Sequence, residues 1–307
     1  MAKDLSIIIV SYNTEVLLKQ CLDSLFKSLK GEAIESEIIV VDNASSDKTV
    51  EMLKESFPAI KIINNQINLG FAKANNQGIS IAEGKFILLL NSDTLIVGKA
   101  ITKMIAFIQH NSSIGIIGPK LYLDQEKTYH PSIKKFTTPY NILISFLPLG
   151  SLIRRFYNKL LLRQNRIREV DWLYGAALLI RRSLFERIGL LDENFFMYSE
   201  DEDLCYRANL NGYKIFYFPK AEIIHLKGKS SKREIKKLLE VFWESKLYYL
   251  AKYYPSAMVK KSLRMLVVIL RMKSFLILDK LFKRDIPDIE KIINKKLEVA
   301  DTRTQTY

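Results

Sequence analysis

Short apolar runs alternate with segments of helical spacing between residues 5 and 90 of the chain. The runs are rich in Ile, Val and Leu, as in strands buried on both faces, and lie at 5–10, 37–41, 59–63 and 86–90. The segments between them repeat apolar residues every three or four positions and lie at 15–29, 48–55 and 71–82. This alternation predicts an α/β fold with a mainly parallel sheet, right-handed crossovers and a ligand site at the carboxyl ends of the strands.

Beyond residue 98 the alternation becomes looser. Helices are predicted at 100–109 and 199–209, and extended segments at 115–121, 172–181 and 213–225. After 228–231 the sequence becomes basic and helical in character. We therefore predict one domain made of two halves, followed by a helical basic C-terminal extension, with boundaries at 1–98, 99–228 and 229–307.

Composition indicates a folded protein of a reducing compartment. With 307 residues, 48% of them hydrophobic, the chain is long enough to bury a sizeable core. Its two cysteines, Cys21 and Cys205, are too far apart and too few for a disulfide framework or a metal ligand set. Residues 1–4 lead directly into the first strand without a cleavable signal, so we expect a cytoplasmic protein.

The formal net charge of +14 implies an anionic partner, which is nucleic acid, an acidic membrane surface or a phosphorylated ligand. The excess is mostly C-terminal, since 227–285 contain 16 Lys and Arg against 5 Asp and Glu. At 154–168 basic and apolar residues are interleaved, as at a membrane surface.

The uncharged segment 136–153 contains prolines and a glycine, which favour a partly buried or interfacial segment over a membrane span. A helix packed on the main domain and a helix docked on a membrane fit 258–282 equally well.

Polar residues collect where the predicted strands end. Ser11 and Tyr12 follow the first strand, Asp42 the second, and Ser92 and Asp93 the fourth. In a parallel sheet these ends meet at one edge. The sequence has neither the Gly-rich fingerprint of dinucleotide binding nor a Walker phosphate loop. Asp93 is either a ligand of a divalent cation that also meets a diphosphate, or an N-cap or turn aspartate, since 92–94 could begin a helix.

Four consecutive acids occupy positions 200–203, directly after Ser199. A capping box at a helix N-terminus explains one or two of them. The surplus predicts either a site where like charges raise one pKa into the general-base range, or nearby positive charge that balances the acids. His225 ends an apolar segment, where a lone histidine is more often a hydrogen-bonded core residue than a metal ligand.

Seven stretches in chain order resemble family 2 of the glycosyltransferases, close to its rhamnosyltransferase-like members. They lie at 6–13, 39–46, 68–78, 88–93, 172–182, 200–207 and 225–230. Each stretch alone is a weak signal, whereas the seven in this order are a strong one. The resemblance implies a Rossmann-like, glycosyltransferase A-type fold and an inverting mechanism. It also implies that 1–98 form the nucleotide-sugar-binding half and 99–228 the acceptor-binding and catalytic half.

The resemblance further implies roles for single residues. The donor-binding set is Ser11, Tyr12, Asp42, Asn75, Ser92 and Asp93, with Tyr12 and Asp42 at the base and ribose. Asp93 and His225 would hold a divalent cation, Mg²⁺ or Mn²⁺, that bridges the diphosphate. Asp201 would take the proton from the acceptor hydroxyl. The acceptor-binding set is Trp172, Gly175 and Glu200.

Two departures from the wider family shape these expectations. The usual D-x-D pattern is Asn91-Ser92-Asp93 here, so that an amide replaces its first carboxylate and weaker metal affinity is expected. The Gln-x-x-Arg-Trp signature of processive synthases is missing from the sequence, which implies the addition of a single sugar. We expect dTDP-rhamnose or a UDP-hexose as donor and a saccharide or lipid-linked saccharide as acceptor. The expected place is the inner face of an anionic membrane, in cell-surface polysaccharide synthesis.

Two other functions compete with this interpretation. A sugar-nucleotide nucleotidyltransferase would share the sheet and the cation, but its Gly-rich N-terminal loop is lacking between residues 5 and 14. A basic nucleic-acid-binding protein would explain the net charge, yet it leaves the acids at 200–203 without a role and should interleave basic residues with exposed aromatic ones. We therefore expect no nucleic-acid partner.

Overall fold

The computed structural model describes residues 3–146, 165–226, 235–262 and 264–265. Its strands are β1 (Leu5–Ser11), β2 (Ser36–Asp42), β3 (Lys61–Asn64), β4 (Phe86–Asn91), β5 (Thr94–Val97), β6 (Ile114–Tyr122), β7 (Tyr129–His130), β8 (Ile133–Lys134), β9 (Arg168–Glu169), β10 (Trp172–Leu173), β11 (Ala177–Arg181) and β12 (Lys214–His225). Its helices are α1 (Glu15–Leu29), α2 (Thr49–Ser56), α3 (Phe71–Ser80), α4 (Ala100–Gln109), α5 (Pro139–Phe146), α7 (Arg182–Ile188), α8 (Glu200–Leu210) and α9 (Ile235–Tyr253). The described residues fall into two compact units. The first takes its residues from 1–136, 164–196 and 200–232, and the second from 137–163, 197–199 and 233–307.

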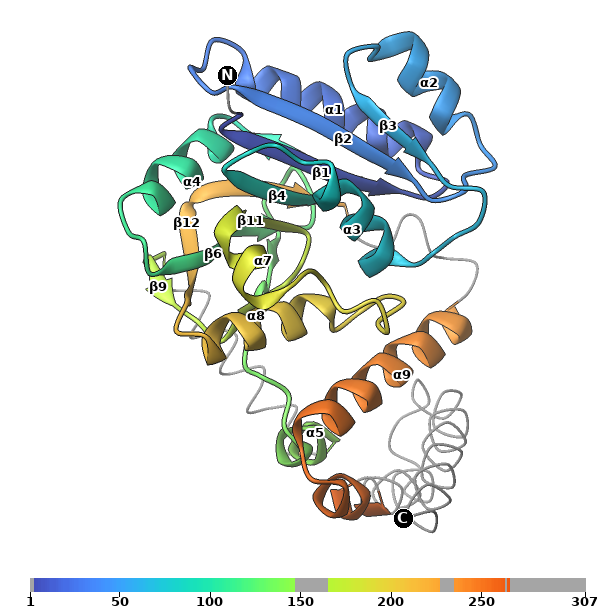
Figure 1. Ribbon diagram of the computed structural model, residues 1–307, viewed down its shortest axis with the longest axis vertical. Helices are drawn as coiled ribbons and strands as arrows, with labels where there is room; N and C mark the ends of the chain where they lie inside the picture. Colours follow the sequence, from blue (N-terminus) through green and yellow to red (C-terminus); the bar gives the residue numbers. More distant parts are fainter. Residues whose placement is uncertain (1–2, 147–164, 227–234, 263, 266–307) are drawn as a thin grey trace. The chain divides into compact units, whose positions relative to one another are not determined.

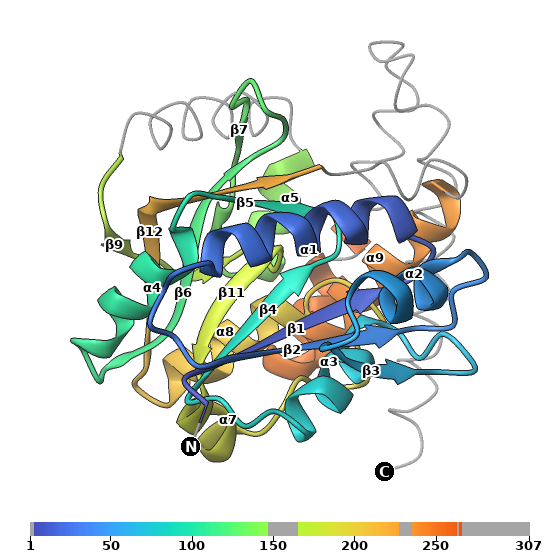
Figure 2. The ribbon, with the colours of Figure 1, turned by 90° about the horizontal axis from the view of Figure 1, so that it is seen from above.

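A ten-stranded sheet forms the centre of the first unit (Figures 1 and 2). Its main order is β3-β2-β1-β4-β11-β6-β12-β5, with β7 beside β6 and β9 beside β12. Strands β3, β2, β1 and β4 are parallel to one another, as are β6 and β12. Strand β11 runs antiparallel to β4 and β6, and β5 runs antiparallel to β12. The predicted α/β fold with a mainly parallel sheet is therefore confirmed.

Helices cover both faces of this sheet and bury β1 along its whole length. On one face Leu5, Ile7 and Ile9 belong to a core that also contains apolar residues of α1, α2 and α4. On the other face Gly78 of α3 lies so close to Ile8 that an added Cβ would come within 2.6 Å of the Ile8 side chain. Figure 1 shows α7 and α8 on the same side as α3. Two-sided burial explains why this strand is a continuous apolar run.

The sequence predicted one extended segment over 172–181, but the structure divides it into two strands. Strand β10 ends at Leu173 and β11 begins at Ala177. The backbone leaves strand pairing between them because Gly175 donates its N–H to the Asp201 carboxylate, and Tyr174 donates its N–H to the carbonyl of Ser132. An apolar run cannot reveal such a break, because the residues on both sides of it are buried.

The residues after Asp93 form strand β5 rather than a helix, so the N-cap interpretation of Asp93 is wrong. Asp93 lies in the turn between β4 and β5, which agrees with the alternative of a turn aspartate. Strand β5 pairs with the end of β12, with Thr94 opposite His225 and Val97 opposite Glu222. The short segment after Asp93 becomes a strand because it pairs with β12, which is distant in the sequence. Asp93 is therefore held at the start of an edge strand.

The second unit contains α5 and α9. Thr137, just before α5, accepts hydrogen bonds from Lys246 Nζ at its Oγ1 (3.1 Å) and from Tyr254 Oη at its carbonyl (3.0 Å). Lys246 is largely buried, with Nζ 5.9 Å from the ring centroid of Phe242 and 5.9 Å from that of Tyr249. Among the described helices, none combines the length and the apolar character that crossing a bilayer requires. Most of the basic segments 154–168 and 258–282 lies outside the described residues.

Candidate active site

The polar ends of three adjacent strands lie at one edge of the sheet, as the parallel pairing predicts. In the register of β1, Ser11 is opposite Asp42 of β2, and the residue before Ser11 is opposite Asn91 of β4. Hydroxyl groups connect these ends. The Ser11 and Thr14 hydroxyls are 2.8 Å apart, and Thr14 Oγ1 donates to Ser92 Oγ at 3.1 Å.

Asp42 is fully buried, yet one of its carboxylate oxygens is unused. Oδ2 accepts a hydrogen bond from the Ser45 N–H at 2.9 Å, whereas Oδ1 has no partner within the described part of the chain. A buried acceptor without a donor is costly. At the adjoining strand end, Tyr12 is 49% exposed. The next residue, Asn13, holds the neighbouring loop by accepting from Ser46 N at 2.8 Å.

Amide side chains shape the loop between β3 and α3. Asn43 Nδ2 donates to Asn68 Oδ1 at 2.8 Å, and Asn43 Oδ1 accepts from Leu69 N at 3.0 Å. Asn75 is almost fully buried, and its Nδ2 donates to the Phe71 carbonyl one helical turn earlier (2.8 Å). The asparagines around this loop therefore bond to backbone groups and to each other, which is the turn chemistry that their residue type favours.

Gly70 is the point at which this loop contacts the segment that leads to the acid cluster. Its φ is +86°, and an added Cβ would lie 2.6 Å from the Phe196 carbonyl oxygen. We expect Gly70→Ala to lower the free energy of unfolding by more than the roughly 1–3 kcal/mol of backbone strain alone, as measured by chemical denaturation. Gly31→Ala is the matched control, because Gly31 has φ +76° and no atom within 4 Å of the added Cβ. Equal losses in the two variants would rule out a role for the contact with Phe196.

Asp93 and His225 face each other although they are far apart in the sequence. The pairing of β5 with β12 brings them together, and Leu226 N donates to the Asp93 carbonyl at 2.9 Å. His225 Nε2 lies 3.1 Å from Asp93 Oδ1 and 3.3 Å from Asn91 Nδ2. The side chains of Asp93 and His225 are 13% and 4% exposed, so the pair is nearly enclosed by protein.

These two residues fit a divalent cation as a partial ligand set. Asp93 offers a carboxylate oxygen and His225 an imidazole nitrogen, both at the carboxyl edge of the sheet. The nitrogen ligand favours Mn²⁺ over Mg²⁺, which takes oxygen ligands. The described residues contain no group of three or more His, Cys, Asp and Glu side chains placed to hold a metal ion. The pair would therefore need phosphate oxygens and water to complete the coordination shell.

Asp201 is the second residue of α8 and is held by two backbone N–H groups. Its Oδ2 accepts from Gly175 N and its Oδ1 from Glu202 N, both at 2.8 Å. Glycine at 175 permits this approach, because an added Cβ would lie 3.1 Å from Asp201 Oδ2. These two hydrogen bonds fix the carboxylate in place.

Residues 174–176 lie between the Asp201 carboxylate and the Asp93–His225 pair. The centroid of the Tyr174 ring is 5.7 Å from that of His225. The N–H of the next residue holds the carboxylate at the start of α8. The Ala176 carbonyl accepts from Asn91 N at 2.9 Å. The predicted base and the predicted metal ligands therefore lie around one short segment of chain.

The rest of the acid cluster at 200–203 is buried, and one of its members has a structural partner. Asp203 Oδ2 is 2.8 Å from Arg207 Nε, one helical turn later, and its side chain is fully enclosed. Arg207 also donates to the carbonyls of Ile188 and Leu190 at the end of α7, each at 2.8 Å. Positive charge thus balances part of the cluster. Asp201 is the least buried of the four acids.

Trp172, which the family resemblance places at the acceptor, offers little of its ring to a ligand in this structure. It is 8% exposed, and its Nε1 donates to the Lys135 carbonyl at 2.9 Å. Glu200 is 6% exposed. Gly175, the third predicted acceptor-binding residue, donates its backbone N–H to the Asp201 carboxylate.

Sequence reasoning missed His130 and Tyr174. The His130 ring stacks on the His225 ring, with centroids 5.4 Å apart and an interplanar angle of 20°, and the Tyr174 ring meets the His130 ring edge-on at 5.2 Å. Neither residue stands out in the sequence, because His130 lies in a two-residue strand and Tyr174 inside an apolar run. The scarcity of histidine, three in the whole chain, is the one signal that could have drawn attention to His130.

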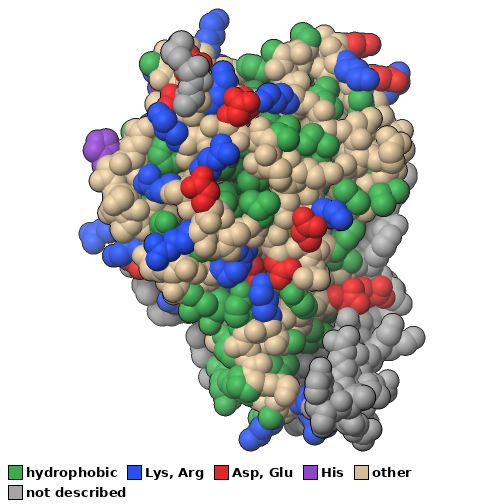
Figure 3. Space-filling model, viewed as in Figure 1, with side chains coloured by type: hydrophobic (Ala, Val, Ile, Leu, Met, Phe, Trp, Pro, Cys, Tyr) green, Lys and Arg blue, Asp and Glu red, His purple; other side chains and the backbone are tan. Residues whose placement is uncertain are grey.

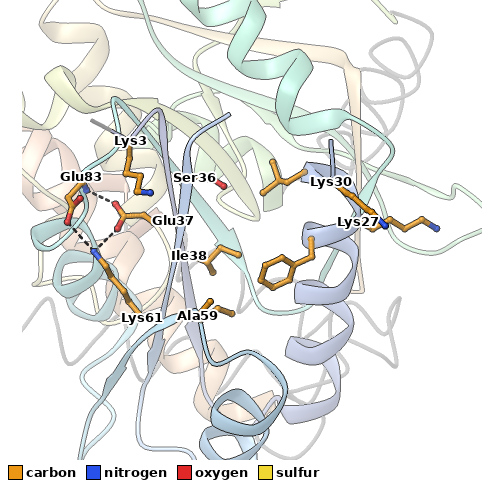
Figure 4. A pocket seen from close by; sticks show the side chains of 12 residues that line it. Lys3, Lys27, Lys30, Ser36, Glu37, Ile38, Ala59, Lys61 and Glu83 are labelled. Carbon is orange, nitrogen blue, oxygen red and sulfur yellow. Dashed lines mark hydrogen bonds and ion pairs between the residues drawn. The ribbon is translucent and has the colours of Figure 1, made fainter. Parts of the chain in front are cut away.

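The hollow drawn in Figure 4 lies at the opposite end of the strands. It measures about 970 Å³ and is lined by residues at the starts of β1, β2 and β3 and at the end of α1. Its acid Glu37 is already satisfied by Lys61 Nζ at 2.8 Å, by the Ser6 hydroxyl and by the Glu83 N–H. Burial alone would raise the pKa of Glu37, but these hydrogen bonds lower it below its usual value. None of the predicted site residues lines this hollow.

Comparison with known proteins identifies the family. The sequence profile of "Glycosyl transferase family 2" matches residues 6–189. The N-acetylglucosaminyl-diphospho-decaprenol L-rhamnosyltransferase of Mycobacterium tuberculosis is 28% identical over 271 residues, which cover 82% of this chain and 85% of that protein. Rhamnosyltransferase WbbL of Escherichia coli is also 28% identical, over 80% of this chain and 92% of its own length.

A solved structure agrees with the fold. Mannosyltransferase PcManGT from Pyrobaculum calidifontis, determined in complex with GDP-Man and Mn²⁺, matches 100% of this chain and 89% of its own with a TM-score of 0.60 and 15% identity. The match supports the predicted glycosyltransferase A-type fold. With the profile match to more than half of its length, the chain belongs to glycosyltransferase family 2 and is an enzyme that transfers a sugar from a nucleotide-sugar donor.

Proposed function

We propose that this enzyme transfers a single sugar from a nucleoside diphosphate sugar to a hydroxyl group of a saccharide acceptor, with inversion at the anomeric carbon. The observation that carries the proposal is the convergence around residues 174–176 of the Asp201 carboxylate with the Asp93–His225 pair. A single displacement with inversion needs a base for the incoming hydroxyl and charge compensation for the departing diphosphate. These two groups of side chains are of the right chemical types to supply both.

Asp201 is the proposed base. Its carboxylate takes the proton of the acceptor hydroxyl while the hydroxyl oxygen forms a bond to the anomeric carbon and the bond from that carbon to the diphosphate breaks. The N–H groups of Gly175 and Glu202 orient the carboxylate. Since Asp201 is the least buried acid of 200–203, it is also the one that an acceptor can approach.

Asp93 and His225 are the proposed cation ligands. A bound Mn²⁺ or Mg²⁺ would stabilise the negative charge that develops on the departing diphosphate. Asp93 would contribute Oδ1 and His225 would contribute Nε2, the two atoms that already face each other at 3.1 Å. Asn91 in place of a carboxylate leaves the site with one negative charge fewer, and we expect a correspondingly weaker affinity for the cation alone.

The donor is proposed to bind at the strand ends of the first half, within residues 1–98. The unused Oδ1 of Asp42 would accept a hydrogen bond from the nucleotide base or the ribose. The half-exposed ring of Tyr12 would pack on the base, and the linked hydroxyls of Ser11 and Ser92 would lie beside the phosphates. Asn75 would support the donor pocket indirectly, since it holds the first turn of α3.

The acceptor is proposed to bind in the half formed by residues 99–228, near Trp172, Gly175 and Glu200. The name of the M. tuberculosis relative refers to a saccharide carried on a diphospho-decaprenol lipid. By analogy, we propose a lipid-linked saccharide as acceptor and dTDP-rhamnose or a UDP-hexose as donor. The product would be an intermediate of cell-surface polysaccharide synthesis.

A peripheral contact with the inner face of an anionic membrane would bring the enzyme to such an acceptor. The net charge of +14 favours it. On α5, Tyr140 and Ile144 are 62% and 50% exposed, although both are apolar. On the face seen in Figure 3, Lys and Arg side chains are interspersed with Asp and Glu, so attraction to the membrane would come from the basic extension at 229–307 and not from this face.

The experiment that tests this function starts from the nucleotide. We expect UDP or dTDP to raise the melting temperature of the full chain, and to raise it further with Mn²⁺, because ligands that bind the folded state stabilise it. GDP and ADP are the comparison ligands. The matching sugar nucleotide should then give a product with one added sugar and the opposite anomeric configuration, read by NMR. A product that retains the donor configuration would exclude the single displacement, and with it the base role of Asp201.

A further inference from the structure

The imidazole of His225 is not held in the way that is usual for a metal-ligating histidine. Such a residue nearly always donates its second ring N–H to a carboxylate, a carbonyl or water, and this hydrogen bond fixes the ring orientation. In His225, Nε2 faces Asp93, whereas the buried Nδ1 has no hydrogen-bond partner in the part of the chain that the structure describes. The contacts of Nε2 with Asp93 and Asn91 are supplemented by contacts of the ring itself.

Two aromatic rings contact His225 in place of that hydrogen bond. The His130 ring is stacked on it at 5.4 Å and nearly parallel to it at 20°, and the Tyr174 ring is tilted against it at 5.7 Å. His130 and Tyr174 also meet each other edge-on at 5.2 Å, so that the three rings form a closed cluster. Stacked and edge-on ring pairs have preferred geometries, so contacts with two rings restrain the orientation of the imidazole.

Both supporting rings are anchored by backbone pairing that does not involve His225. His130 belongs to β7, lies opposite Leu121 of β6 and is 6% exposed. Tyr174 is anchored by its own N–H, which donates to the Ser132 carbonyl at 2.8 Å. The cluster therefore joins the β6–β7 hairpin, the turn at 174–176 and the end of β12.

We infer that His130 is a positioning residue. Together with Tyr174, its ring holds the His225 imidazole so that Nε2 stays directed at Asp93 Oδ1 and at the place of the cation between them. The inference rests on the proposed role of His225 as a metal ligand. It adds a residue that comes from a different hairpin and contacts the ligand through its ring face.

The first test needs no metal, since the ring orientation can be observed directly. The chain has three histidines, so the imidazole carbon–proton signals of the full chain in EDTA are assigned with His110→Ala, His130→Ala and His225→Ala. We expect His130→Ala to shift the His225 signals strongly, because a stacked ring is removed. His130→Phe keeps a ring face and should leave them closer to their original positions. His110, exposed on the far end of α4, is the control position.

The second test measures Mn²⁺ binding in the presence of UDP by the loss of the free Mn²⁺ signal in electron paramagnetic resonance. Loss of an outer residue that orients a ligand typically weakens metal binding about 10–100-fold, and we expect His130→Ala to fall in that range. His130→Phe should recover most of the affinity, and His110→Ala should match the unchanged chain. If His130→Ala does not fold, His130→Leu, which fills the space without a ring face, takes its place beside His130→Phe.

The outcomes separate this inference from the proposed function. Unchanged His225 signals and unchanged Mn²⁺ affinity in His130→Ala would overturn the inference. So would equal losses in His130→Phe and His130→Ala, because the ring face would then not be the cause. If His225→Ala itself retains Mn²⁺ affinity, the proposed metal role of His225 fails first. Loss of affinity in His225→Ala but not in His130→Ala would remove only the positioning role.

Discussion

Asp201→Asn is expected to lower the rate of sugar transfer by about 10²–10⁴-fold, the range in which a general base contributes. The amide has nearly the shape of the carboxylate and keeps one oxygen as an acceptor for a backbone N–H, but it cannot take a proton from the acceptor hydroxyl. Donor binding involves other residues and should stay nearly intact. The measurements are kcat at saturating donor and the rise in melting temperature with nucleoside diphosphate and Mn²⁺.

Asp203→Asn is the matched control for this substitution. It makes the same chemical change two residues farther along α8, where the carboxylate pairs with Arg207 and is fully enclosed. Leaving Arg207 without its charged partner should cost stability, because breaking a buried pair is unfavourable. The folded fraction should still transfer sugar. Unchanged turnover in Asp201→Asn would remove Asp201 from the role of base.

Asp93→Ala is expected to weaken nucleotide binding in the presence of Mn²⁺ but not in the presence of a chelator. The substitution removes the carboxylate that faces His225 Nε2 at 3.1 Å and leaves the imidazole as the remaining proposed protein ligand. A metal ion supplies several kcal/mol of charge stabilisation in the transition state, so we expect transfer to fall by about a hundredfold or more. Calorimetric titration with UDP, with Mn²⁺ and with EDTA, measures the binding part.

Asp23→Ala removes an exposed carboxylate on α1 and serves as the control. Its Oδ2 lies 4.0 Å from Lys19 Nζ at the surface, where an ion pair contributes little. Nucleotide binding and transfer should both match the unchanged chain. If Asp93→Ala weakens nucleotide binding equally in Mn²⁺ and in EDTA, Asp93 acts through the shape of the loop after β4 and not through a cation.

The elements that the sequence predicted best are those with strong local patterns. The structure begins and ends α1 and α4 at the predicted residues, Glu15–Leu29 and Ala100–Gln109. Strand β3 was predicted at 59–63 and lies at Lys61–Asn64, a shift that follows from its weaker apolar character and partial exposure at the sheet edge. The prediction for 172–181 failed because burial on both sides of a turn looks the same in sequence as a continuous buried strand.

The sequence predicted which residues belong to the site but not the contacts between them. The motif order identified Asp93, Asp201 and His225, but not that Gly175 holds Asp201 or that Asp203 is already paired with Arg207. The unused oxygen of Asp42 could not be foreseen either, because hydrogen-bond satisfaction depends on which backbone groups approach it. His130 carried no local signal at all.

The sequence by itself determined the parallel half of the sheet, the edge at which its polar residues gather and the family to which the chain belongs. It could do so because apolar periodicity and strand-end residues are local properties, repeated along one stretch of chain. Only the tertiary structure decided which of the polar residues meet. The pairing of β5 with β12 brings Asp93 to His225, and the turn at 174–176 contacts Asp201. These contacts join segments that are far apart in the chain, and the local sequence of one segment does not indicate its contact with the other.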